Sequence, residues 1–171
     1  MCYFSRILFC FVANVTAVIV VFPDTAFGTS THELSGKIRI TKVSDGDSLR
    51  SGNLRIRIFG VDAPELKQTC QEQNGVSWPC GLAAHQKLTK LIGADKTLQC
   101  AVRDVDRYGR LVMQCFKGVV DVGAEMVRSG HALAYRAFTK IYIAEEHHAR
   151  SAHRGVWRGT FLSPWEWRRQ N

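Results

Sequence analysis

The segment LRIRIFGVDAPE, residues 54–65, is the most informative part of this 171-residue chain. Apolar and basic residues alternate from Leu54 to Ile58, which is typical of a half-buried strand with arginines on its outer face. Arg57 and Asp62 stand five positions apart, so a regular strand would turn them to opposite sides. Gly60 interrupts the alternation, and a β-bulge there would bring both side chains to one side.

The rest of the chain alternates strand and helix patterns. Polar and apolar residues alternate over 37–43, residues 97–103 and 110–116 read as the arms of a hairpin, and helical spacing is found at 82–92, 122–129 and 141–153. A polar segment, residues 66–80, reads as a long loop. Strands first, one helix between and helices last predict an α+β domain whose strand-rich half is compatible with a small barrel.

The first 28 residues have the organisation of a secretory signal peptide. One arginine lies near the start, residues 7–22 carry no charge, and small residues at cleavage spacing end at Gly28. An uncleaved anchor is the alternative, but the apolar run stops at Pro23, short of the ~20 residues that span a bilayer. We therefore expect a signal peptide over 1–28 and a domain over 29–171 that is secreted or periplasmic, with no stable membrane association after cleavage.

The charge of the chain belongs to the predicted domain. The whole chain carries a formal +8, and the first 28 residues hold one arginine and one aspartate, which cancel. A basic domain favours polyanionic partners such as nucleic acid, anionic lipid or acidic polysaccharide. The content of 46% apolar and 22% charged residues excludes a disordered or collagen-like chain.

Four cysteines follow the predicted signal peptide, at Cys70, Cys80, Cys100 and Cys115. An even number in a small exported domain suggests two disulfides, with three possible connectivities. The spacing favours Cys70 with Cys80 and Cys100 with Cys115. For the second pair there is a geometric reason. A hairpin turn at 106–109 places residues opposite each other when their numbers sum to 215, and Cys100 and Cys115 meet this condition. A zinc site is the alternative, but the chain has no Cys-x-x-Cys pair and its spacings match no common zinc pattern.

Charged residues that suit phosphodiester chemistry gather in three short stretches: residues 45–47 (DGD), 57–65 (RIFGVDAPE) and 106–110 (DRYGR). Two carboxylates, Asp47 and Asp62, suit a hard divalent cation completed by carbonyls and waters. Glu65 could orient or deprotonate a water, while Arg57 and Arg110 would neutralise charge on a phosphorane-like transition state. Each motif alone also has an ordinary explanation, as a hairpin turn or a surface cation. Their combination favours metal-assisted phosphodiester hydrolysis.

Together these stretches resemble the staphylococcal nuclease, or thermonuclease, family. The matching segments are residues 43–49, 57–65, 106–110 and 122–130, and together they span about two thirds of the predicted domain. The resemblance implies a five-stranded OB-fold barrel with about three packed helices. It also implies an endonuclease that uses calcium to cleave both DNA and RNA and leaves 3′-phosphate ends. We expect a monomer with nucleic acid as its substrate.

The resemblance assigns metal and base roles residue by residue. Asp47 and Asp62 match the carboxylates that hold one Ca²⁺ ion, Ala63 matches the main-chain carbonyl ligand, and Glu65 matches the proposed general base. The family often has threonine where this chain has Ala63, so any contribution of a hydroxyl is lost although the carbonyl remains.

Five further residues match positions that touch the substrate. Arg57 and Arg110 match the catalytic arginines, and Arg107 and Tyr108 match positions that hold the terminal phosphate and the nucleotide. Tyr135 falls near tyrosines that contact a base, across a gap in the alignment. Tyr108 could equally cover the hairpin turn, since it stands between Arg107 and Gly109.

Two other functions compete with the nuclease interpretation. An OB-type domain can bind nucleic acid without cutting it, because a fold does not fix an activity. Such a module would be expected to lack part of the catalytic set, whereas Arg57, Glu65 and Arg110 are all present here. A protein that binds anionic lipid is the third possibility and depends on an uncleaved anchor.

Overall fold

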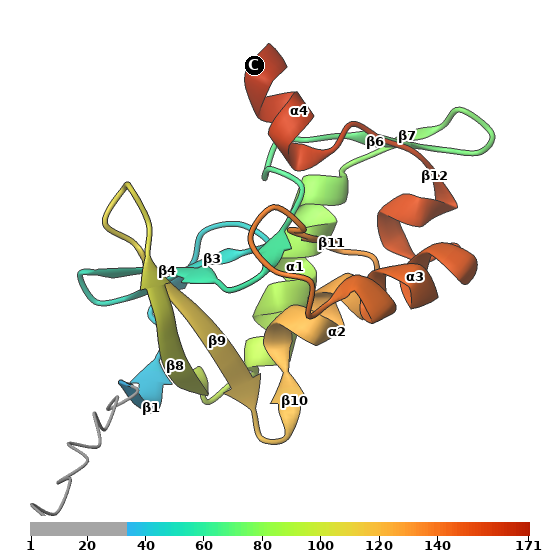
Figure 1. Cartoon of the computed structure of the whole chain (residues 1–171). Coiled ribbons are helices and arrows are strands. Elements are labelled where there is room, and N and C mark those ends of the chain that lie inside the picture. Colours follow the sequence, from blue (N-terminus) through green and yellow to red (C-terminus); the bar gives the residue numbers. More distant parts are fainter. Residues whose placement is uncertain (1–33) are drawn as a thin grey trace, which may run out of the picture. The chain divides into compact units, whose positions relative to one another are not determined.

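The structure is a computed structural model that describes residues 34–171, so the predicted signal peptide over 1–28 lies outside the described residues. The described chain has the predicted α+β class. Its main sheet is curled and has seven strands in the order β1-β8-β9-β4-β3-β2, with β10 paired to β9 (Figure 1). These strands are β1 (Ser35–Arg39), β2 (Lys42–Val43), β3 (Ser48–Ser51), β4 (Leu54–Ile58), β8 (Thr97–Val105), β9 (Leu111–Lys117) and β10 (Val120–Asp121).

The predicted count of five strands is not confirmed. The alternating segment over 37–43 divides into β1 and β2, because Ile40 donates its N–H to the Lys96 carbonyl while Thr41 donates to the Arg50 carbonyl on the other side. The curled sheet is consistent with an OB-like fold. Pairing is antiparallel throughout the main sheet except between β4 and β9, which run parallel.

Two small sheets lie outside the main one. In the first, β5 (Val61–Asp62) pairs with β11 (Leu133–Ala134). In the second, β6 (Cys70–Glu72) pairs with both β7 (Ser77–Trp78) and β12 (Gly159–Thr160). The segment over 66–80 therefore holds a short hairpin rather than only a loop.

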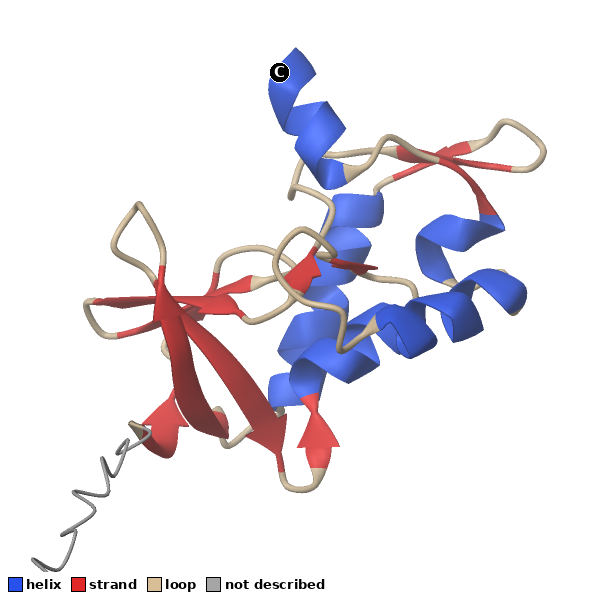
Figure 2. Ribbon diagram, viewed as in Figure 1, coloured by secondary structure: helices blue, strands red, loops and turns tan. Residues whose placement is uncertain are grey.

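Helices gather on one side of the curled sheet (Figure 2). They are α1 (Cys80–Ile92), α2 (Val122–Arg128), α3 (Ile143–Ser151) and α4 (Pro164–Gln170), with a 3₁₀ turn η1 at Gly155–Arg158. Three of them agree with the predicted helices, and α4 is additional. None of the helices within residues 34–171 is long and apolar enough to cross a membrane.

The hairpin of β8 and β9 confirms the predicted cysteine pairing. Cys100 lies opposite Cys115, and the two form a disulfide; Cys70 and Cys80 form the other. The pairing sum of 215 holds up to Val102 and becomes 216 at Asp104, because the register shifts between them. The Cys100–Cys115 disulfide belongs to the main core between sheet and helices, whereas Cys70 and Cys80 belong to a second cluster with Leu133.

The chain reverses at Gly60 by a turn and not by the predicted bulge. Strand β4 ends at Ile58, Gly60 has φ 73°, and β5 then joins a different sheet. A positive φ is costly for any residue with a Cβ, so glycine suits this corner. The turn nevertheless has the predicted consequence, since it brings Asp62 back beside Arg57.

Candidate active site

The guanidinium of Arg57 lies between two buried carboxylates. Its Nη1 is 3.0 Å from Oδ2 of Asp47, and its Nη2 is 2.7 Å from Oδ1 of Asp62. Asp62 is fully buried and Asp47 is 4% exposed, whereas the Arg57 side chain keeps 15% exposure. Buried carboxylates are rarely tolerated without a partner, so the charge of Arg57 allows both aspartates to stay buried in the folded protein.

Asp47 is positioned by a tight turn between β2 and β3. Its N–H donates to Oδ1 of Asp45, and its Oδ2 accepts from the Ala63 N–H at 3.2 Å. A Cβ at Gly46 would stand 2.6 Å from the Ala63 Cβ and 2.7 Å from the Ala84 Cβ. The turn can therefore pack against Ala63, which follows β5, and against α1 only because residue 46 has no side chain. The DGD motif is both a turn and a source of a buried carboxylate.

The protonation behaviour of this pair follows from burial. Burial raises the pKa of the Asp47 carboxyl, and the charge of Arg57 acts in the opposite direction. Burial also acts to lower the pKa of Arg57, but Asp47 and Asp62 outweigh it, so the pKa of this guanidinium is raised. Arg57 therefore stays charged and cannot serve as a proton donor.

Glu65 is held through the buried side chain of Gln68. The Gln68 Oε1 accepts from the Glu65 N–H at 3.2 Å, and its Nε2 donates to the Leu162 carbonyl at 2.7 Å. Gly81 packs against the same backbone, because a Cβ at this position would stand 1.7 Å from the Glu65 carbonyl oxygen. The first turn of α1 and the segment before α4 thus fix the backbone of Glu65, while its carboxylate is partly exposed.

Arg168 of α4 joins Asp62 to Glu65. Its Nη2 is 2.8 Å from Oδ2 of Asp62, and its Nη1 is 3.1 Å from Oδ1 of the same residue and 2.7 Å from Oε1 of Glu65. A chain of alternating charges therefore runs Asp47, Arg57, Asp62, Arg168 and Glu65, which we call the acidic centre. Three carboxylates against two guanidiniums leave it one net negative charge.

The two predicted catalytic arginines come from neighbouring parts of the main sheet: Arg57 lies in β4, and Arg110 directly precedes β9, which pairs with β4. Arg57 pairs with Val112 in the parallel ladder of β4 and β9, and Arg110 stands two positions before Val112. Because side chains alternate along a strand, continuing the β9 pattern back by one residue predicts that Arg110 faces the same way as Arg57. Its Nε, however, is 2.7 Å from Oδ2 of Asp106, so its ion pair lies within the hairpin turn rather than in the acidic centre.

The remaining predicted substrate residues lie in two places, on the β8–β9 hairpin turn and next to the turn at Gly60. Tyr108 is 56% exposed on the hairpin turn; the Arg107 guanidinium lies 4.9 Å from its ring centre, and that of Arg110 lies 5.6 Å away. Tyr135 lies beside the turn at Gly60, where its N–H donates to the Gly60 carbonyl. Its half-buried ring stacks on Phe138 at 6.5 Å. The hairpin residues offer an exposed aromatic ring between cations, which suits stacking on a base.

The predicted metal ligands have the right donor chemistry for a hard cation. Asp47 and Asp62 offer carboxylate oxygens and Ala63 a neighbouring carbonyl, which are the donors that Ca²⁺ or Mg²⁺ takes. All four carboxylate oxygens already accept from protein groups, including Ser48 Oγ on Oδ1 of Asp47. Within residues 34–171 no group of three or more His, Cys, Asp or Glu side chains is arranged to hold a metal. A cation would therefore depend on two carboxylates and the Ala63 carbonyl, and at Asp62 it would compete with the guanidinium contacts that both oxygens already accept.

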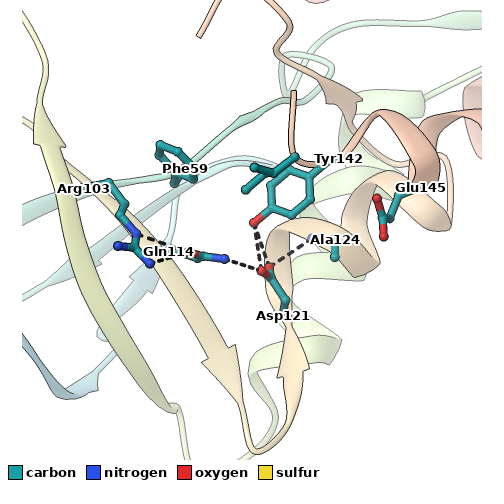
Figure 3. A pocket seen from close by; sticks show the side chains of 8 residues that line it. Phe59, Arg103, Gln114, Asp121, Ala124, Tyr142 and Glu145 are labelled. Atoms are coloured by element: carbon teal, nitrogen blue, oxygen red, sulfur yellow. Dashed lines mark hydrogen bonds between the residues drawn. The ribbon is translucent and has the colours of Figure 1, made fainter. Parts of the chain in front are cut away.

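A surface pocket elsewhere in the protein has no residue in common with the predicted site. It is lined by Phe59, Arg103, Gln114, Asp121, Ala124, Ile141, Tyr142 and Glu145 (Figure 3). Burial and the neighbouring Asp121 carboxylate raise the pKa of the Tyr142 hydroxyl, which donates to both Asp121 oxygens. Asp121 in turn accepts from the Ala124 N–H as the N-cap of α2. Tyr142 and Asp121 therefore stabilise the start of α2.

Sequence reasoning missed Gln68 and Arg168. Gln68 lies in a polar segment without periodicity, so nothing marks it as a buried bridge. The helix that carries Arg168 had a signal, because Ser163-Pro-Trp-Glu166 is a capping box with proline at the first helical position, and the structure has it. The partner of Arg168 had none, since Asp62 lies 106 positions away.

Comparisons with known proteins identify relatives of this chain. A family model described as "Staphylococcal nuclease homologue" matches residues 55–159. The chain is 34% identical over 134 residues to a "Probable staphylococcal-like nuclease CAN2" of Oryza sativa subsp. japonica, which covers 77% of this chain and 33% of that protein. It is 30% identical over 138 residues to an "Uncharacterized endonuclease" of Escherichia coli O157:H7, covering 76% and 83%.

A third relative carries a different kind of name. The chain is 32% identical over 118 residues to the "Succinoglycan biosynthesis protein ExoI" of Rhizobium meliloti (strain 1021), covering 68% of this chain and 62% of that protein. The chain thus spans one third to less than two thirds of the length of several relatives that it matches. The family model covers most of the described domain, including Arg57, Asp62, Glu65 and Arg110. The chain belongs to the staphylococcal nuclease homologue family.

Proposed function

We propose that this protein is an endonuclease that uses calcium to hydrolyse phosphodiester bonds in DNA and RNA without regard to the sugar. The observation that carries the proposal is the acidic centre, in which carboxylates from separate stretches of chain converge on Arg57. A family that contains proteins named nucleases and endonucleases supports the same reaction class. The chain's net charge of +8 supports a polyanionic substrate.

In this proposal Asp47, Asp62 and the Ala63 carbonyl hold the cation. When bound, Ca²⁺ would polarise a phosphoryl oxygen and neutralise charge on the phosphate. Arg57 has five N–H donors, of which at most three are taken by Asp47, Asp62 and the Val61 carbonyl, so two are left for a phosphate oxygen. Arg110 would bind the phosphate from the same face of the sheet.

Glu65 is the residue that we assign to the water. Its carboxylate is 29% exposed, so a water can reach it, and it would accept the proton as the water oxygen attacks phosphorus. The bond from phosphorus to the 5′ oxygen breaks, the 5′ oxygen takes a proton from solvent, and the 3′-phosphate remains. Arg107, Tyr108 and Tyr135 would bind the terminal phosphate and the bases.

The test is cleavage of single-stranded DNA and RNA with and without Ca²⁺. We expect cleavage that a chelator abolishes and that Glu65→Gln strongly reduces, whereas Glu72→Gln, which alters a carboxylate paired with Arg158, leaves it unchanged. Cleavage that persists with chelator and with Glu65→Gln would contradict the proposal. Salt-sensitive binding without any cleavage would favour the non-catalytic module instead.

We also propose that the protein acts outside the cytoplasm, as a secreted or periplasmic monomer. Two disulfides support an oxidising compartment. Amino-terminal sequencing of the protein recovered from cells tests the signal peptide, and a mature start near Thr29 is the expected result. Light scattering at several concentrations tests the monomer.

A further inference from the structure

Arg168 occupies the carboxylate that the proposed cation needs. Both of its terminal nitrogens contact Asp62, at 2.8 Å and 3.1 Å, which is the bidentate geometry of a strong guanidinium–carboxylate pair. With this pair in place, Oδ2 of Asp62 faces Arg168 and Oδ1 is shared by Arg168 and Arg57. A divalent cation at Asp62 would therefore stand beside two guanidiniums, and like charges at such short range repel.

The two arginines differ in how firmly they are held. Arg57 lies within β4, its side chain is 15% exposed, and it also supports Asp47. The Arg168 side chain is 39% exposed and belongs to α4, a seven-residue helix in which only Pro164 is buried. Arg168 is therefore the cation that can leave Asp62 with little disturbance of the core.

The attachment of α4 permits such a movement. Figure 1 shows α4 beside the end of α1 where the 66–80 segment lies. The segment that leads into α4 is fixed by the bond from Gln68 to the Leu162 carbonyl, and the first turn of α4 is closed by the capping box of Ser163 and Glu166. Both attachments precede Arg168, so the last turn can move while the start of the helix stays in place.

We infer that Arg168 is a positioning residue that acts as an internal substitute for the metal ion: it holds Asp62 and Glu65 together in the metal-free protein and is displaced when the cation binds. The inference rests on the proposed function, since it takes Asp62 as a metal ligand. It goes further in assigning α4 a role, because displacement of Arg168 also frees Glu65 from its ion pair. Cation binding and release of the proposed base are then one event.

The test is calorimetric titration of the purified protein with Ca²⁺ alone. Arg168→Gln removes the competing charge, so we expect it to bind Ca²⁺ on the order of tenfold more tightly than the unaltered protein. Arg169→Gln is the matched control, because it removes the same charge from an exposed neighbour in α4 and is expected to leave the affinity unchanged. Equal or weaker binding by Arg168→Gln would overturn the inference.

A second variant and a second measurement guard against a folding defect. Arg168→Lys keeps the charge but loses the bidentate contact, so we expect Ca²⁺ affinity between those of the unaltered protein and Arg168→Gln. In the unaltered protein, Ca²⁺ should accelerate amide hydrogen exchange in residues 168–170 and not in α1. Exchange in α4 that Ca²⁺ leaves unchanged or slows would contradict displacement.

The outcomes separate the inference from the proposed function. If the unaltered protein binds Ca²⁺ and cleaves DNA with it while Arg168→Gln binds no better, the inference alone fails. If neither protein binds Ca²⁺, both fail. Calcium binding by Arg168→Gln that exceeds that of the unaltered protein supports both.

Discussion

The Nη2 atom of Arg57 lies 2.7 Å from Oδ1 of Asp62, although the two residues belong to different sheets. The turn at Gly60 makes this contact possible, because it ends β4 and sends the chain back along a new direction. Around this contact the protein has assembled the charges that its proposed reaction needs. Substitutions at four positions test how the turn, the arginines and their supports contribute, and a fifth tests the pH dependence of stability.

Gly60→Ala should destabilise the protein more than the same change at another turn. Gly60 has φ 73°, and a Cβ there would lie 2.8 Å from Thr139 Cγ2 and 3.0 Å from the Tyr142 ring. Gly52 has φ 56°, but a Cβ at that position would meet nothing within 4 Å, so Gly52→Ala is the control. We expect the free energy of unfolding, measured with denaturant, to fall by about 1 kcal/mol in Gly52→Ala and by about 2–3 kcal/mol in Gly60→Ala. Equal losses would contradict the proposed crowding.

Arg110→Ala should reduce cleavage strongly while lowering the free energy of unfolding by about 1 kcal/mol at most. Its ion pair with Asp106 is partly exposed, and such pairs contribute about 0–1 kcal/mol. Removal of one preorganised cation from a phosphoryl-transfer site costs on the order of 10²–10³ in rate. Single-turnover cleavage and thermal unfolding of Arg110→Ala are compared with those of Arg39→Ala, an exposed cation on β1. An unaltered rate would remove Arg110 from the site.

Arg57→Ala should reduce both rate and stability, in contrast to Arg110→Ala. Its removal leaves the buried Asp47 and Asp62 without this partner, and breaking a buried pair costs about 3–5 kcal/mol. Denaturant unfolding measures this loss, and Arg57→Lys should recover part of it. A loss no larger than that of Arg110→Ala would show that Arg168 alone compensates Asp62.

Gln68→Ala should lower the free energy of unfolding by about 1–3 kcal/mol, because it leaves two buried hydrogen-bonding partners unpaired. The two partners are the Glu65 N–H and the Leu162 carbonyl. Gln73→Ala, on the exposed end of the β6–β7 hairpin, provides the control. Since Gln68 connects the loop that carries Glu65 to the segment before α4, amide exchange should rise in both segments of Gln68→Ala. A rise in neither would contradict this connection.

Stability should fall below neutral pH partly because of His131. Burial, with a smaller contribution from Lys87, lowers the pKa of this imidazole from its usual 6.5. The unfolded chain therefore takes up a proton at a higher pH than the folded protein, and stability is lost as pH falls through 6.5 toward the folded pKa. Unfolding between pH 8 and 5 should show a shallower decline for His131→Gln than for His147→Gln, an exposed residue of α3. Identical declines would exclude this role.

Contacts between residues close together in the chain could be predicted from local sequence patterns. Contacts between distant segments could not. The alternation over residues 54–58 and the glycine at 60 predicted that Arg57 and Asp62 would share a side, although the corner is a turn. The hairpin arithmetic predicted the contact of Cys100 with Cys115, because antiparallel register follows from the position of the turn. No periodic sequence pattern indicates the bond from Gln68 to Leu162 or that from Arg168 to Asp62, because each bond joins segments that meet only in the folded domain.

The parallel pairing of β4 with β9 has a consequence for how the protein folds. Ile56 pairs with Leu111, 55 positions further along the chain, so a large loop must close before Arg57 and Arg110 share a surface. Contacts of such long sequence separation form slowly compared with hairpins and helices. We therefore expect the surface that carries Arg57 and Arg110 to form late, after the β8–β9 hairpin, so that a partly synthesised chain contains both arginines before they are brought together.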